Sequence, residues 1–221
     1  MPTIVITGAS RGIGKGLAEA YAADGWTVIA TARSDEDLDA LSSIDNVEAH
    51  ALDVTDAGSR DAFVAAVGDR PIDVLLNNAG ILAGGDPEEE AWAKSFLVNT
   101  IAPTLIARAL ADNVAASDRR VLAVMSSKVG SIDDNGMGGN IMYRSSKTAV
   151  NMAWKCLELE YAPRGISTVI LHPGWVETDM GGPNALIDVD TSVNGLRERI
   201  AETNPDNSGR YVAYDGQPIP W

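Results

Sequence analysis

The chain has 221 residues and a formal net charge of −14, with 45% hydrophobic and 22% charged residues. This length and balance suit one globular domain with a full hydrophobic core. An acidic surface repels phosphate backbones and anionic headgroups, so we expect neither nucleic acid nor a membrane as a partner.

The scarcity of cysteine and histidine argues against a disulfide-bonded or a metal-binding protein. Cys156 is the only cysteine, so no internal disulfide can form and a cytoplasmic protein is expected. We expect Cys156 to be a small buried residue of an apolar helix rather than a nucleophile. His50 and His172 lie far apart in the chain, so no metal site is predicted. No leader peptide and no transmembrane segment are expected, since no apolar run reaches the necessary length.

Apolar, β-rich runs alternate with helical patterns along the whole chain. This alternation predicts an α/β fold, a single Rossmann-type doubly wound parallel sheet with helices on both faces, over residues 1–221. Ligands of such sheets bind beyond the carboxyl ends of the strands, so the residues after each strand are the site candidates. The predicted strands are 3–7, 27–31, 47–51, 74–77, 121–126 and 167–172, and the predicted helices are 12–24, 35–43, 56–67, 87–113, 141–162 and 191–203.

A glycine-rich turn follows the first predicted strand. Gly8, Gly12 and Gly14 are spaced Gly-x-x-x-Gly-x-Gly, which differs from the commoner Gly-x-Gly-x-x-Gly fingerprint. Glycine lets the backbone turn tightly and approach a ligand, and the following helix offers free N–H groups to a pyrophosphate. The turn predicts a dinucleotide site; a plain strand-to-helix turn is the alternative.

Arginines near the second strand bear on the choice of cofactor. An acidic residue at this strand end suits the ribose of NAD, whereas a basic one suits the 2′-phosphate of NADP. Ala32 and Arg33 stand here, and Arg11 of the glycine turn could reach the same phosphate. We therefore predict NADP(H), with NAD(H) as the alternative because Asp35 and Glu36 are close by. Arg33 as a plain surface charge also stays open.

Polar turns follow the third and fourth strands. Asp53 is predicted either to accept a hydrogen bond from an adenine amino group or to cap the next helix. The segment after the fourth strand, Asn78, Ala79 and Gly80, is typical of an ordinary turn. It would also suit a turn that faces a cofactor.

A proline interrupts the long fourth helix. We expect Asp86 to cap this helix, with Pro87 in its first turn. Pro103 cannot donate to the carbonyl of Asn99, so a kink is predicted that frees this carbonyl to hold a water. A helix that merely bends is the alternative.

The fifth and sixth strands end in further candidates. Ser127 ends the fifth strand, where its hydroxyl could donate to a substrate oxygen, and a Gly- and Asp-rich loop follows at 130–139. After the sixth strand, Pro173 and Gly174 turn the chain over the site, and Thr178 could bond a carboxamide. Trp175 is either a pocket wall or a core residue.

Tyr143 and Lys147 begin the next apolar helix. Residues four apart share one face of a helix, so the phenol is expected beside the ammonium. A neighbouring positive charge lowers the pKa of a phenol, and the pair could then exchange a proton near neutral pH. Taken alone, this spacing also arises by chance.

Together these motifs resemble the short-chain dehydrogenase/reductase family, and within it the C-factor and sniffer-type carbonyl reductase group. The resemblance rests on six motifs in order, and the ending 214–221 is similar to that group too. Ser127 precedes Tyr143 by sixteen residues, more than is usual in the family, which leaves Ser131 as an alternative serine. The matching motifs are Thr7-Gly8-x-x-x-Gly12-x-Gly14, Asn77-Asn78-Ala79-Gly80, Asn99, Ser127, Tyr143-x-x-x-Lys147 and Pro173-Gly174-x-x-x-Thr178.

The resemblance implies a catalytic set. Tyr143 would be the general acid, Lys147 would lower its pKa and hold ribose hydroxyls, Ser127 would bind the substrate oxygen, and Asn99 would hold a relay water. The implied cofactor-binding residues are Gly8, Ser10, Arg11, Gly12, Ile13, Gly14, Arg33, Asp53, Val54, Asn78, Ala79, Gly80, Tyr143, Lys147, Pro173, Gly174, Val176 and Thr178.

The expected activity is NADPH-dependent reduction of a small aldehyde or ketone to an alcohol. A cofactor-binding signalling protein of C-factor type is the alternative, and a sugar-nucleotide epimerase or dehydratase is disfavoured because it needs a larger C-terminal region. A homodimer or homotetramer is expected, with Trp154, Cys156 and Leu159 on a second buried face of their helix. Ile81, Leu82, Met142 and Trp175 hint at an apolar substrate pocket.

Overall fold

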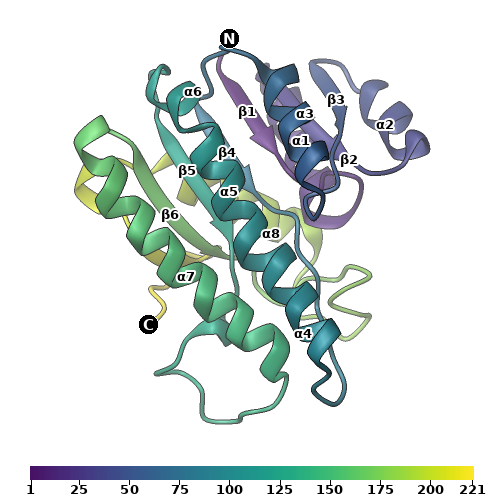
Figure 1. Ribbon diagram of the computed structural model, residues 1–221, viewed down its shortest axis with the longest axis vertical. Helices are drawn as coiled ribbons and strands as arrows, with labels where there is room; N and C mark the ends of the chain where they lie inside the picture. The colour runs from purple at the N-terminus through teal and green to yellow at the C-terminus, as the bar shows by residue number, and fades with distance from the viewer.

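The computed structural model describes residues 1–221, and its centre is a seven-stranded parallel sheet (Figure 1). The strand order is β3-β2-β1-β4-β5-β6-β7, so the chain starts in the middle and winds outward in both directions. This confirms the predicted doubly wound α/β fold. The strands are β1 Thr3–Ile6, β2 Thr27–Ala32, β3 Val47–Ala51, β4 Val74–Asn77, β5 Val121–Met125, β6 Ser167–His172 and β7 Arg210–Ala213.

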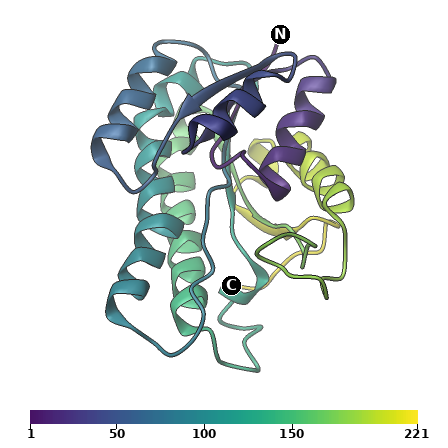
Figure 2. The same ribbon diagram turned by 90° about the vertical axis from the view of Figure 1, so that its right-hand side faces the viewer.

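Helices cover both faces of the sheet, with α3, α5 and α7 on one side and α1 and α8 on the other (Figure 2). The helices are α1 Gly12–Ala23, α2 Asp35–Ser42, α3 Ala57–Val67, α4 Glu89–Phe96, α5 Ala102–Ala109, α6 Ala111–Ala115, α7 Ile141–Tyr161 and α8 Val189–Ala201.

Alternation along the strands supplies the two cores. In β1, Ile4 and Ile6 face the layer of α1 and α8, whereas Val5 faces the layer of α3, α5 and α7. All three side chains are fully buried, which explains why the strand is apolar at every position after Thr3. Trp154 of α7 fills the second core and is also fully buried.

The predicted helix 87–113 is divided in the structure. It begins at Glu89 after Glu88, which makes no side-chain cap, so the cap expected from Asp86 is wrong. Instead of a simple kink, a π-helical turn spans Leu97–Ile101, and Pro103 lies in the first turn of α5. The wider turn accommodates a proline that has no N–H to give.

Two other expectations fail. The strand β7 was not predicted, because its four residues open with Arg210 and end before a Tyr-Asp-Gly turn. Cys156 is exposed, not buried. It follows Trp154 by two positions, which is about 200° around a helix, so the two side chains leave α7 on opposite faces. None of the helices combines the length and apolarity of a membrane span.

Candidate active site

A cavity of about 610 Å³ opens beyond the carboxyl ends of the central strands. A cavity of this size is large enough for a cofactor. The glycine turn lines one part of it and the start of α7 another, so the strand winding brings together motifs that are over a hundred residues apart. Its lining includes Gly8, Ser10, Arg11, Gly12, Ile13, Gly14, Arg33, Asp53, Val54, Asn78, Ala79, Gly80, Tyr143, Lys147, Pro173 and Thr178.

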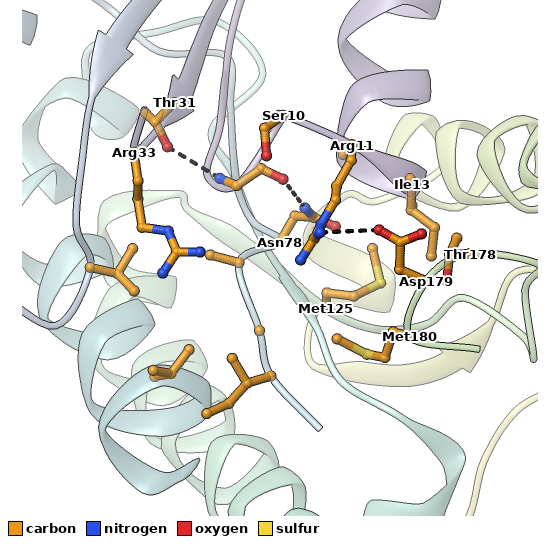
Figure 3. A pocket seen from close by; sticks show the side chains of 18 of the residues that line it. Ser10, Arg11, Ile13, Thr31, Arg33, Asn78, Met125, Thr178, Asp179 and Met180 are labelled. Atoms are coloured by element: carbon orange, nitrogen blue, oxygen red, sulfur yellow. Dashed lines mark hydrogen bonds and ion pairs between the residues drawn. The ribbon is translucent and has the colours of Figure 1, made fainter. Parts of the chain in front are cut away.

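The glycine turn is shaped for close backbone approach. Gly8 and Gly12 have φ values of +69° and +55°, in the left-handed region that glycine adopts freely. A Cβ at Gly14 would lie 2.2 Å from the carbonyl oxygen of Gly8 and 2.5 Å from Nδ2 of Asn78. Asn78 also donates to the Gly8 carbonyl at 2.9 Å, and the Gly8 N–H donates to Thr31 Oγ1 at 3.1 Å (Figure 3).

This packing directs the N-terminus of α1 toward the cavity. Arg11, the N-cap residue, gives no side-chain hydrogen bond to the first turn. The free N–H groups and the positive end of the helix dipole therefore suit a pyrophosphate. The turn thus fits the phosphates of a dinucleotide.

Arg33 and Arg11 lie on opposite sides of the turn (Figure 3). Both line the cavity. Arg11 pairs with Asp179 at 3.0 Å, and both side chains of this ion pair are exposed. Such a pair contributes little stability, so Arg11 is available to a phosphate. Lys94 of α4 also lines the cavity and was missed in the sequence, because nothing in a helical pattern tells which polar residue will face a ligand.

Asp53 does not cap the following helix. The cap of α3 is Asp56, which accepts from the Ser59 N–H at 2.6 Å. Asp53 instead accepts from the N–H and hydroxyl of Thr55, and these bonds, together with the charge of Arg33, hold its pKa below the ordinary value. The prediction that Asp53 caps the helix is thereby wrong. Its place in the cavity lining favours the alternative, an acceptor for the adenine amino group.

Tyr143 and Lys147 line the far end of the cavity, and Ser127 lies next to Tyr143 without being part of the lining. Nζ of Lys147 lies 5.7 Å from the centre of the Tyr143 ring and donates to the Met125 carbonyl at 2.9 Å. Lys147 is buried, whereas Tyr143 is partly exposed. The Ser127 side chain is the hydrogen-bonding neighbour of the phenol.

Burial dominates the acid–base properties of this pair. It raises the pKa of Tyr143 to about 12, and Ser127 works against that rise. Burial also lowers the pKa of Lys147 to about 8. The expectation that Lys147 makes the phenol more acidic is therefore wrong for the protein alone. Burying the Tyr143 phenolate costs more free energy than the Lys147 ammonium returns by attraction at this distance. The phenol therefore stays protonated at neutral pH.

Asn99 lies in the π-helical turn and supports the site from behind. Its Oδ1 accepts from the Ile81 N–H at 2.9 Å, and its Nδ2 donates to the Ile81 carbonyl and to Ser146 Oγ. These bonds tie the loop after β4 to the residue beside Lys147. The side chain does not line the cavity, so Asn99 could act only through what it holds.

The structure favours Ser127 over Ser131. The Ser131 hydroxyl is buried, donates to the Trp221 carbonyl at 3.2 Å and accepts from the Asp134 N–H at 3.0 Å, whereas the partner of the Tyr143 phenol is Ser127.

Two predicted cofactor residues lie outside the cavity lining. Val176 is buried, and a Cβ at Gly174 would lie 2.6 Å from Cδ1 of Ile187. Both shape the turn after β6 rather than the cavity wall. Trp175 is half-exposed, so it is not a core residue. Of the suggested apolar pocket residues Ile81 lines the cavity, whereas Met142 is buried. Nowhere do three His, Cys, Asp or Glu side chains gather as they would around a metal ion.

The sequence model of the short chain dehydrogenase family matches residues 2–186. The chain belongs to this family of oxidoreductases, as its motifs indicated.

Among its relatives, the C-signal of Myxococcus xanthus is 40% identical over 164 residues, 72% of this chain and 99% of that protein. The carbonyl reductase Sniffer of D. melanogaster is 33% identical with a TM-score of 0.92, and each structure covers 100% of the other. An NADPH-bound carbonyl reductase from chicken fatty liver is 31% identical with a TM-score of 0.93, over 100% of this chain and 99% of that one.

Proposed function

We propose that this protein is an NADPH-dependent oxidoreductase that reduces the carbonyl of a small aldehyde or ketone to an alcohol, by a reversible hydride transfer. The observation that carries the proposal is the place of the Tyr143 phenol, which lines one end of a dinucleotide-sized cavity beside Lys147 and next to Ser127. Similarity to two carbonyl reductases over the whole chain supports it.

The residues would divide the work as follows. The glycine turn and the start of α1 hold the pyrophosphate, and Tyr143 and Lys147 flank the nicotinamide end. When bound, the nicotinamide supplies the hydride. Ser127 donates to the substrate oxygen, and Tyr143 gives its proton to that oxygen as negative charge develops. A pKa of about 12 keeps the phenol loaded with this proton at neutral pH.

Lys147 places a positive charge beside the phenol of Tyr143. With a pKa of about 8 it is mostly charged at pH 7, where it favours a negative oxygen nearby. Asn99 holds Ser146, next to Lys147, and so steadies the first turns of α7. A water on the Asn99 carbonyl would link Lys147 to solvent.

The choice of NADPH over NADH rests on Arg33 and Arg11 at the adenosine end. Arg33→Ala is expected to lower the ratio of kcat/KM for NADPH to that for NADH by tenfold or more, because an arginine–phosphate bond is charge-assisted. Lys15→Ala, a cation outside the cavity lining, is the matched control and should leave the ratio unchanged. A wild-type enzyme that prefers NADH would reject the cofactor assignment.

The C-signal similarity favours one other function, a cofactor-binding signalling protein with little turnover. NADPH oxidation against a panel of aldehydes and ketones separates the two. A protein that only binds the cofactor would not need the phenol of Tyr143 as a proton donor, so we expect turnover. NADPH binding without any oxidation across the panel would reject the reductase.

We further propose a homodimer or homotetramer formed through α5 and α7. These helices leave Leu105, Met152 and Leu159 exposed on the side away from the sheet. Trp154, which was expected there too, belongs to the core instead. Static light scattering is expected to show a multiple of 23.3 kDa, and Met152→Glu with Leu159→Lys should give a monomer. A wild-type monomer would contradict this assembly.

We also propose that the protein is cytoplasmic, because the exposed Cys156 thiol stays reduced in that compartment. Recovery of the protein from a secreted fraction would contradict this location.

A further inference from the structure

The turn that carries Ser127 is held from behind by the last strand. The Ser127 carbonyl accepts the hydroxyl hydrogen of Tyr211, which lies on β7. The same carbonyl accepts the Gly130 N–H at 2.8 Å, across a short 3₁₀ turn at Lys128–Gly130. A carbonyl oxygen has two lone pairs, so both of its acceptor positions are filled.

Tyr211 sits in a small buried polar cluster. It is 4% exposed, and burial raises the pKa of its phenol to about 12, so it remains a hydrogen-bond donor. The side chains of Asn151 and Ser126 lie next to its hydroxyl, and Ser126 Oγ donates to Asn151 Oδ1 at 2.6 Å. The cluster joins the end of β5, the middle of α7 and β7 directly behind Ser127 and Tyr143.

A second attachment lies a few residues further on. The segment after β7 folds back on that strand, with the Ile219 N–H donating to the Tyr211 carbonyl at 2.9 Å. The Trp221 ring then lies 5.8 Å from the Tyr211 ring, and the Trp221 carbonyl accepts the N–H groups of Ile132 and Asp133. In both ribbon views this segment lies beside the loop between β5 and α7 (Figures 1 and 2).

We infer that Tyr211 is a positioning residue for Ser127. Two hydrogen bonds to one carbonyl fix the plane of the peptide that follows Ser127, and the serine side chain is thereby aimed at Tyr143. Tyr211 is buried and its hydroxyl is bonded to the Ser127 backbone, so it touches neither substrate nor cofactor. The inference rests on the proposed function, because it assigns Tyr211 a part in the same reaction.

Tyr211→Phe removes the hydroxyl and keeps the ring, and the Ser127 carbonyl retains the Gly130 N–H, so no buried acceptor is orphaned. We expect kcat for carbonyl reduction to fall roughly tenfold, since a loosened serine meets the substrate oxygen less often. The Kd for NADPH should not change. Because Ser127 lowers the pKa of Tyr143, the pH profile of alcohol oxidation should shift to higher pH.

A double-mutant cycle separates positioning from general stability. If Tyr211 acts through Ser127, Tyr211→Phe should have no further effect on kcat in a Ser127→Ala enzyme. Equal effects of Tyr211→Phe in both backgrounds would overturn the inference. Tyr161→Phe, a buried tyrosine at the far end of α7, is the control and should leave kcat and the pH profile unchanged.

Hydrogen exchange tests the same contact without turnover. Tyr211→Phe should speed the exchange of the Gly130 N–H several-fold, because the carbonyl that holds it loses its second anchor. If the protein failed to oxidise NADPH with every carbonyl compound tested, the proposed function would be rejected. The hydrogen-exchange measurement would still decide whether Tyr211 holds the Ser127 turn. Unchanged exchange at Gly130 would overturn it.

Discussion

Tyr143→Phe is expected to lower kcat for carbonyl reduction about a thousandfold, the usual size of general acid catalysis. The substitution removes the phenol proton that would pass to the substrate oxygen, and it leaves the ring in place. Steady-state kinetics with NADPH and an aldehyde measures the effect. The Kd for NADPH, from fluorescence titration, should change by no more than about threefold, the worth of one hydrogen bond.

The pH dependence of the wild-type enzyme tests the same role. Burial raises the pKa of Tyr143 to about 12, so the phenolate needed for alcohol oxidation is scarce below that pH. Its fraction increases tenfold with each pH unit, and the oxidation rate should therefore rise with pH across the neutral range. A Tyr143→Phe enzyme with wild-type turnover, or with the same rise, would remove Tyr143 from the reaction.

Gly14→Ala should weaken NADPH binding by about a hundredfold. The added Cβ would lie 2.2 Å from the Gly8 carbonyl oxygen, within backbone that cannot move aside as a flexible side chain would. The start of α1 must shift away from the glycine turn, and its N–H groups then miss the pyrophosphate. Overpacking of this kind costs a few kcal/mol, and each 1.4 kcal/mol is a tenfold change in Kd.

Gly58→Ala is the matched control. Gly58 lies in the first turn of α3, and its Cβ would stand 3.4 Å from Oδ1 of Asp56, an ordinary contact. Alanine is a better helix former, so the melting temperature should rise slightly while NADPH affinity stays constant. If Gly14→Ala bound NADPH as tightly as the wild type, the glycine turn would not be the pyrophosphate site.

Periodicity and residue type predict most of the secondary structure of this chain. Six of the seven strands and their alternation with helices were predicted, mainly because the central strands are buried on both faces and must be largely apolar. The glycine turn and the Tyr143–Lys147 pair could be recognised because backbone approach and helical spacing restrict the residue types that work.

The failures share one cause, which is that exposure and contact are three-dimensional. Cys156 and Trp154 both looked buried within an apolar helix, but only one of them faces the sheet. The pKa of Tyr143 was expected to fall because a lysine stood one turn away, and burial raises it instead. No spacing rule connects Tyr211 with Ser127, since 84 residues separate them.

The order of residues thus determined by itself most of the segments that become strands and helices, and which side chains have the chemistry for a nucleotide and a proton. These are local properties of neighbouring residues. Only the tertiary structure decided between Ser127 and Ser131 and showed that Asp53 does not cap α3. It also showed that β7 lies behind the turn that carries Ser127. Such outcomes depend on burial and on contacts between distant segments, which exist only once the sheet has formed.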